Sequence, residues 1–271
     1  MLGNFANGFT QIFAWAKRSQ RVATKGATVK VNLGSSLFVA DGWINVDGAP
    51  HIFFAKWPKI FLNCTFRFSG AKDWFGPEAD YIAVLKTHRF VHHDLSYGLP
   101  FADNSVDYFY ASHILEHFHS DTAEAIVRDA YRALKKGGRI RICVPDLQHA
   151  IKLYLAGEKE KALEFFFQDS KAGMFYRHKY MYDFHLLKST LNKAGFELVE
   201  KVGYREGKVP DIEKLDNRPE QTLYLEAVKQ PDRQVPVRRG EFSGNTSIER
   251  EIDGTLSLKF LKPNVRNLRH F

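Results

Sequence analysis

The segment SHILEHF contains two histidines and a glutamate in a span of five residues, at His113, Glu116 and His117. Histidine changes charge near neutral pH, so it is suited to taking a proton from a reacting hydroxyl. If the segment is helical, His113 and His117 share one face because they are four residues apart. Either is a candidate general base, and a structural hydrogen-bonding role for His117 is the alternative. We expect no metal ion, because this spacing alone does not confirm a third ligand.

A second polar group follows at His178, Tyr182 and Asp183. We regard these three residues as candidates for contact with a substrate. The alternative for Asp183 is a helix N-cap, because apolar residues at helical spacing begin directly after it and end at Gly195.

A third group combines a glycine turn with a nearby acid. In VKVNLGSSLFVADGWINVDG (29–48), one apolar run ends at Gly34 and a second ends at Asp47. Glycine lets the backbone approach a ligand, and an acid at a strand end can accept both hydroxyl protons of a ribose. The pair indicates a nucleoside site, and a tight turn followed by a strand-end acid is the alternative. The stretch contains neither G-x-G-x-x-G nor the Gly-Lys-Ser/Thr of a triphosphate loop.

Short apolar runs recur along the chain and predict buried strands. We expect them at 29–33, 43–46, 90–93, 106–111, 139–144, 196–202 and 222–228. Between the last strands lie amphipathic segments, expected as helices at 147–156, 158–168 and 183–194. Strands that alternate with helices predict an α/β fold, with a mostly parallel sheet and helices on both faces.

The clearest helical pattern begins near residue 121. Asp121 and Glu124 fit a capping box, and Ile126, Val127 and Ala130 then recur on one face. Lys135 and Lys136 suit a helix C-terminus, and we expect Gly137-Gly138 to end this helix.

Charge is concentrated at the two ends of the 271-residue chain. The net charge is +8, and residues 1–30 hold five basic groups and no acid. Residues 31–230 carry equal numbers of basic and acidic groups, which argues against a nucleic-acid groove through this region. The two cysteines, Cys64 and Cys143, form no disulfide framework and suit a reducing, cytoplasmic location.

Three further motifs occur in order: LPFADNSVD (99–107), SHILEHF (112–118) and RALKKGGR (132–139). Together with the pair Asp94-Leu95, they resemble the class I S-adenosylmethionine-dependent methyltransferases. The resemblance covers residues 29–229 and implies a Rossmann-like fold with seven strands. HKYMYDFHLLKSTLNKAGF (178–196) and PDIEKLDNRPEQTLYLEAVK (210–229) are similar to one branch, often associated with cell-surface polysaccharide biosynthesis.

The resemblance also implies roles for individual residues. The backbone of Asn32, Gly34, Ser35 and Ser36 would lie along the methionine part of the cofactor, and Asp47 would bind the ribose. Asp94 would accept from the adenine amino group, with Leu95 packed on the ring. Ser112 and His113 would border the sulfonium and the substrate entrance. Two departures from the family pattern are Ser36, where a second glycine is usual, and a short loop at 37–42 in place of a helix.

These observations predict three regions: an extension at 1–28, a methyltransferase domain at 29–230 with an aromatic-rich insertion at 48–89, and an extension at 231–271. We expect O-methylation of a saccharide or related small molecule. A nucleic-acid methyltransferase and a non-catalytic protein with a binding or assembly role are the alternatives. Residues 5–18 or 51–68 would suit peripheral membrane contact, and 231–271 would suit a hairpin or a homodimer arm.

Overall fold

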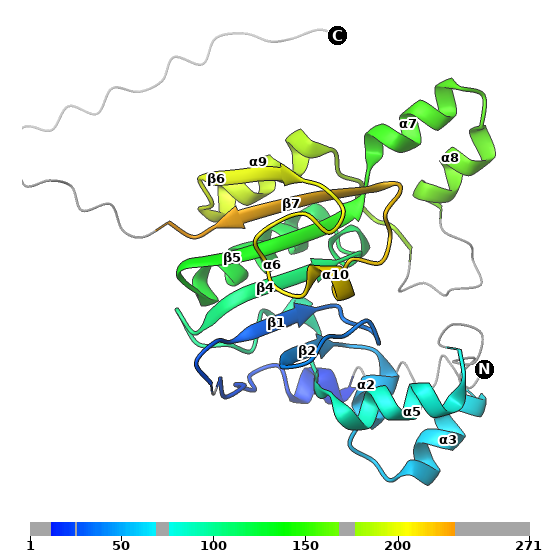
Figure 1. Cartoon of the computed structure of the whole chain (residues 1–271), viewed down its shortest axis with the longest axis vertical. Helices are drawn as coiled ribbons and strands as arrows, with labels where there is room; N and C mark the ends of the chain where they lie inside the picture. The colour runs from blue at the N-terminus through cyan, green and yellow to red at the C-terminus, as the bar shows by residue number, and fades with distance from the viewer. Residues whose placement is uncertain (1–11, 25, 69–75, 168–176, 231–271) are drawn as a thin grey trace, which may run out of the picture. The chain divides into compact units, whose positions relative to one another are not determined.

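The computed structural model describes residues 12–24, 26–68, 76–167 and 177–230. Its centre is a seven-stranded sheet with the order β3-β2-β1-β4-β5-β7-β6 (Figure 1). The strands are β1 (Lys30–Leu33), β2 (Trp43–Asp47), β3 (Arg89–His92), β4 (Val106–Ser112), β5 (Leu134–Pro145), β6 (Leu198–Val202) and β7 (Thr222–Val228). Each expected strand is present, so this part of the sequence-based assignment is confirmed.

The direction of the strands also matches the expectation. β1 pairs in parallel with β2 and β4, β2 with β3, and β4 with β5. Only β7 is reversed, because it pairs antiparallel with both β5 and β6. The carboxyl ends of β1 to β5 therefore meet at one edge of the sheet, where open α/β folds bind their ligands.

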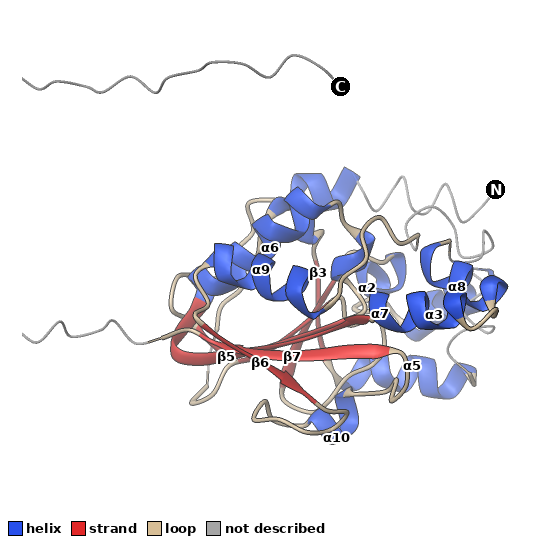
Figure 2. Ribbon diagram, turned by 90° about the horizontal axis from the view of Figure 1, so that it is seen from above, coloured by secondary structure: helices blue, strands red, loops and turns tan. Residues whose placement is uncertain are grey.

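Helices cover both faces of this sheet (Figure 2). α6 (Ser120–Ala133) and α9 (Phe184–Ala194) pack on one face, and α10 (Ile212–Leu215) lies on the other. α7 (Leu147–Leu155) and α8 (Lys159–Phe166) follow β5. The segment between β2 and β3 forms α2 (Pro50–Phe54), α3 (Lys59–Phe68) and α5 (Glu78–Thr87), with Pro58 between the first two.

The ends of α6 differ from the sequence-based prediction. The N-cap position is His119, and Asp121 lies inside the first turn, where its carboxylate accepts from the backbone N–H of Thr122. The helix ends at Ala133, because Leu134 already pairs with Val106 as the start of β5. Gly137, at φ +80°, belongs to the irregular stretch of β5 that follows.

Alternate residues of β5 face two different cores. Ile140, Ile142 and Val144 pack with the apolar faces of α6 and α9. On the opposite face Arg141 is fully buried and pairs with Asp216 and Glu226. Cys143 is buried beside this ion cluster, and burial raises the pKa of its thiol to about 12. The alternation explains how an apparently apolar strand carries an arginine in its middle.

Candidate functional site

Asp47 stands at the carboxyl end of β2 and connects two loops. Its Oδ2 accepts from the backbone N–H of Ser36, and its Oδ1 accepts from that of Ala49, each at 2.7 Å. The N–H of Gly34 donates to the carbonyl of Val46 at 2.9 Å, which adds a second tie between β2 and the turn. A carboxylate offers about four lone-pair sites, so two remain for a ligand.

Gly34 is required for a reason within the protein. Its φ is +66°, and a Cβ at this position would lie 2.5 Å from Cγ1 of Ile114. The glycine therefore lets the turn after β1 pack against the segment after β4. Ser36 also has a positive φ, at 44°. The expected tight turn is present.

The side chains of Asn32 and Ser35 have structural roles. Asn32 is 2% exposed, and its Nδ2 donates to the carbonyl of Phe38 at 2.8 Å and faces Oδ1 of Asn45 at 3.3 Å. Ser35 is also buried. These bonds hold the short loop 37–42, which replaces a helix as the sequence predicts. A backbone contact of Asn32 or Ser35 with a cofactor stays a prediction.

The loop after β3 lies directly beside the loop after β2. The N–H of His93 donates to the carbonyl of Asp47 at 3.1 Å, and a Cβ on Gly48 would lie 3.6 Å from Cα of Asp94. Asp94 is the N-cap of the short helix η1 (Leu95–Tyr97), and its Oδ1 accepts from the N–H and the hydroxyl of Ser96. The structure therefore brings together the turn at 34–36, Asp47 and Asp94.

Leu95 has a structural position. Its side chain is 4% exposed and belongs to the main apolar core. Packing of that side chain on an adenine ring stays a prediction.

The segment after β4 is not an α-helix. β4 ends at Ser112, His113 has φ +49°, and only Leu115–His117 form a short 3-10 helix, η2. The condition under which His113 and His117 would share a helical face is therefore not met. His113 instead lies between Thr222, whose Oγ1 is 3.2 Å from Nε2, and Glu116, whose Oε1 is 3.2 Å from Nδ1. Both ring nitrogens of His113 thus face protein groups.

Glu116 is fully buried although it carries a carboxylate. Among the described residues, neither oxygen has a hydrogen-bond partner of good geometry, and the nearby Nδ1 of His113 is not aligned to donate. Burial raises the pKa of Glu116, but contact with His113 and the charges of His113 and His117 outweigh it and hold that pKa below its usual value. The residue is therefore held as a buried anion, which is costly unless it is paired.

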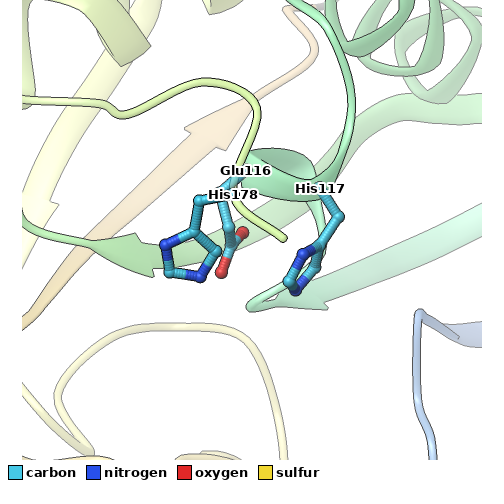
Figure 3. A group of neighbouring side chains, drawn as sticks. All are labelled: Glu116, His117 and His178. Atoms are coloured by element: carbon cyan, nitrogen blue, oxygen red, sulfur yellow. The ribbon is translucent and has the colours of Figure 1, made fainter. Parts of the chain in front are cut away.

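Glu116 lies between two imidazole rings, those of His117 and His178 (Figure 3). One ligand atom from each of the three residues lies within 4.8 Å of the other two, and the two ring centroids are 5.2 Å apart. The backbone fixes this arrangement, because the carbonyl of Glu116 accepts from the N–H groups of Lys179 at 2.7 Å and Tyr180 at 3.2 Å. The structure therefore places His178, from the second polar group predicted from the sequence, beside Glu116 and His117 of the first.

Tyr182 and Asp183 have structural positions. Tyr182 is 1% exposed in the main core, and burial raises the pKa of its phenol. Asp183 is the N-cap of α9, because its Oδ1 accepts from the N–H of Leu186 at 2.8 Å. The helix-cap alternative for Asp183 is thus the one observed, and a substrate contact by either residue stays a prediction.

A cavity of about 280 Å³ lies at the amino ends of β1, β2 and β3, opposite the carboxyl ends that carry Asp47 and Asp94. Lys30, Trp43 and Arg89, at the amino ends of β1, β2 and β3, contribute to its lining. This cavity is remote from the strand ends that carry Asp47 and Asp94, so we do not assign the nucleoside site to it.

Comparison with known proteins adds one family match. Residues 77–142 match a family described as a methyltransferase domain. The matched segment spans α5 to β5 and includes Asp94, His113 and Glu116. No curated protein sequence matches the chain.

Several solved structures are similar in outline. A candidate O-methyltransferase from Nostoc punctiforme PCC 73102 is 14% identical, with a TM-score of 0.44 over 84% of this chain and 57% of its own. A SAM-dependent methyltransferase from Thermotoga maritima is 17% identical, with a TM-score of 0.44 over 82% of this chain and 92% of its own. SibL, another SAM-dependent methyltransferase, is 15% identical, with a TM-score of 0.46 over 82% of this chain and 56% of its own. The chain thus spans just over half the length of the first and third of these proteins.

The strand order, together with the family match over residues 77–142, indicates the fold of the molecule. It has the fold of the class I S-adenosylmethionine-dependent methyltransferases, with β7 as the reversed strand. The cofactor implied by this class is S-adenosylmethionine. The turn at 34–36, Asp47 and Asp94 fit it, because they place two carboxylates and a positive-φ turn along one edge of the sheet.

Proposed function

We propose that this chain is an O-methyltransferase that acts on a saccharide or a related hydroxylated small molecule. The observation that supports cofactor use most directly is the position of Asp47, whose carboxylate holds the turn at 34–36 and keeps lone pairs for the hydroxyls of a ribose. Asp94 lies in the adjoining loop, in reach of a different part of the same nucleoside.

Methyl transfer from this cofactor needs few catalytic groups from the protein. S-adenosylmethionine supplies an already activated methyl group when it is bound. The chain must align the acceptor, exclude water and receive a proton from the acceptor hydroxyl. We place the proton-handling group at Glu116, His117 and His178, directly after β4, because both ring nitrogens of His113 already face Thr222 and Glu116.

The choice of a saccharide rests on two segments, 178–196 and 210–229, that resemble the branch associated with cell-surface polysaccharide biosynthesis. The two segments differ in whether they can contact an acceptor. Segment 210–229 has structural tasks: Asp211 binds Lys30 and Trp43, whereas Asp216 and Glu226 bind Arg141. Segment 178–196 brings His178 to the end of β4. The proposal of a saccharide acceptor therefore depends on segment 178–196.

The test is transfer of an isotope-labelled methyl group from S-adenosylmethionine to a panel of free and nucleotide-linked sugars. We expect label in an ether that resists alkaline hydrolysis. Label in an alkali-labile ester or on an amine would contradict O-methylation of a hydroxyl. Label in added RNA or DNA would instead favour the nucleic-acid alternative.

We also propose peripheral contact with an anionic membrane surface. Among the described residues no helix could cross a bilayer. The contact surface consists of large apolar side chains that are 39–70% exposed: Ile12, Trp15, Trp57, Ile60 and Phe61. Phe13 packs on Phe53 with ring centroids 5.1 Å apart, which joins the N-terminal segment to α2. Residues 1–11 lie outside the described residues.

Sedimentation with phosphatidylglycerol vesicles tests this contact. Ile60→Ser with Phe61→Ser should reduce the bound fraction, whereas Leu155→Ser, at a side chain 79% exposed on α7, should not. Equal loss in both variants, or no binding by the original chain, would exclude this surface.

A further inference from the structure

We infer that Glu116, His117 and His178 form a binding site for a first-row divalent cation of the zinc type. The three side chains come from η2 and from the segment before α9, and the carboxylate lies between the rings (Figure 3). The sequence-based expectation of no metal rested on the spacing of residues 113–117, which lacks a confirmed third ligand, and on a family resemblance that does not suggest zinc. His178 supplies the missing ligand.

The carboxylate gives the first argument. Glu116 is 0% exposed, and both of its oxygens have no hydrogen-bond partner of good geometry among the described residues. Buried carboxylates are paired with cations or coordinate metals, because an uncompensated buried charge is unstable. The nearest cationic candidate, Nδ1 of His113, lies 3.2 Å from Oε1 but is not aligned to donate. A cation beside the carboxylate would compensate the charge.

The orientation of the two histidines gives the second argument. Nδ1 of His178 lies 2.5 Å from the carbonyl oxygen of Phe165, and Nδ1 of His117 lies 3.3 Å from that of Arg177. A carbonyl oxygen can only accept, so the proton of each ring belongs on Nδ1 and the lone pair on Nε2. Metal-binding histidines commonly carry this kind of backbone partner, which fixes the tautomer and the ring orientation.

The size and composition of the cluster give the third argument. Zinc binds histidine nitrogen and carboxylate oxygen at about 2.0–2.2 Å, which puts neighbouring ligand atoms roughly 3.5 Å apart. The three ligand atoms lie within 4.8 Å of one another, so binding requires a contraction of at most about 1.3 Å, within the reach of side-chain rotation. Two imidazoles and one carboxylate suit zinc, iron, cobalt or nickel better than magnesium or calcium, which prefer oxygen ligands.

Three protein ligands leave at least one coordination position open. This arrangement is typical of catalytic rather than structural sites. Insofar as it rests on the proposed function, the inference assigns the open position to the acceptor hydroxyl, whose pKa a bound cation would lower. With the cation bound, Glu116, His117 and His178 act as ligands, and the hydroxyl proton passes to solvent water rather than to one of them. The cation site itself does not depend on methyl transfer.

Calorimetric titration of chelator-treated protein with Zn²⁺, without cofactor or acceptor, tests the site. We expect one equivalent to bind, Co²⁺ to give ligand-field absorption, and Mg²⁺ to bind far more weakly. His117→Asn and His178→Asn keep a donor near the position of Nδ1 and remove Nε2. Each should weaken Zn²⁺ binding at least tenfold, as should Glu116→Gln. His185→Asn, at an exposed histidine on α9, is the matched control and should bind like the original chain.

Circular dichroism would establish that each variant is folded. Absence of stoichiometric Zn²⁺ and Co²⁺ binding in the folded original chain would overturn the inference. Binding that survives all three ligand variants, or that is lost equally in His185→Asn, would overturn it too. Such a failure would leave cofactor binding unaffected, so it is distinguishable from failure of the proposed function.

Discussion

The backbone N–H of Ser36 donates to the carboxylate of Asp47 at 2.7 Å, so the turn after β1 is held by the acid that ends β2. This bond joins the two features on which the proposed nucleoside site rests. It also offers a role for Ser36 in place of a second glycine: at φ +44°, the residue directs its N–H toward Asp47. The acid therefore both shapes the turn and remains able to receive a ligand.

Replacement of Asp47 by Ala should weaken binding of S-adenosylhomocysteine by about 1–3 kcal/mol, because charge-assisted hydrogen bonds to the ribose are lost. Calorimetry on the folded variant measures this change. Asp41→Ala is the control, since the side chain of Asp41 is 89% exposed in the loop between β1 and β2. Equal affinity in Asp47→Ala and the original chain would remove Asp47 from the site.

Gly34→Ala should destabilise the protein by about 2–5 kcal/mol, from a left-handed backbone and a clash with Ile114. Gly157→Ala isolates the backbone cost, because Gly157 has φ +91° and open space at the Cβ position. That control should lose only about 1–2 kcal/mol. Urea unfolding compares the two variants. Similar losses in both would show that the contact between Gly34 and Ile114 is not tight.

Asp216→Ala should destabilise the fold by about 3–5 kcal/mol, because it leaves the buried guanidinium of Arg141 with one carboxylate instead of two. Asp103→Ala provides the contrast. Asp103 also pairs with an arginine, Arg132, at 2.5 Å, but its side chain is 70% exposed. Thermal unfolding should shift strongly for the first variant and little for the second. A small shift in the unfolding temperature of Asp216→Ala would contradict the claim that the buried ion cluster is essential for stability.

Stability should fall as the pH drops below about 6.5, the ordinary pKa of histidine. Burial lowers the pKa of His51, His92 and His93 in the folded protein. The unfolded chain therefore takes up protons that the folded chain does not, so the free energy of unfolding decreases down to the folded pKa values. Urea unfolding at pH 7.5 and 5.5 measures the loss.

His93→Gln tests the assignment of part of this pH dependence. His93 is held by Gln20 at Nδ1 and by the carbonyl of Gly98 at Nε2, so its neutral form is the one that fits. The variant should lose less stability between the two pH values than the original chain. His119→Gln, at an exposed histidine, should show the full loss. An unchanged pH dependence in His93→Gln would show that this residue does not contribute.

The sheet could be predicted because each strand is a short apolar run, and strand-helix alternation fixes the parallel arrangement. The end of α6 could not, because Leu134 is as suitable for a helix as for a strand. Its pairing with Val106 decides the outcome. Periodicity within one segment does not reveal a partner in another.

The candidate site was predictable only in part, for a similar reason. Asp47 and Asp94 follow strands, so the sequence places them at one edge. The contact of His178 with Glu116 depends on backbone bonds from Lys179 and Tyr180, which no local pattern contains. The burial of Arg141 and Glu226 was also missed, because charges in strands are usually solvent-facing. Their positions among alternating apolar residues were the available signal.

The central claim is that this fold binds S-adenosylmethionine at the edge formed by Asp47 and Asp94. Calorimetric titration with S-adenosylmethionine and S-adenosylhomocysteine tests it directly, with NAD and ATP as controls. We predict selective binding of the first two in the micromolar range. Absence of binding by folded protein, or equal binding of NAD or ATP, would contradict the claim and favour a non-catalytic role for the fold.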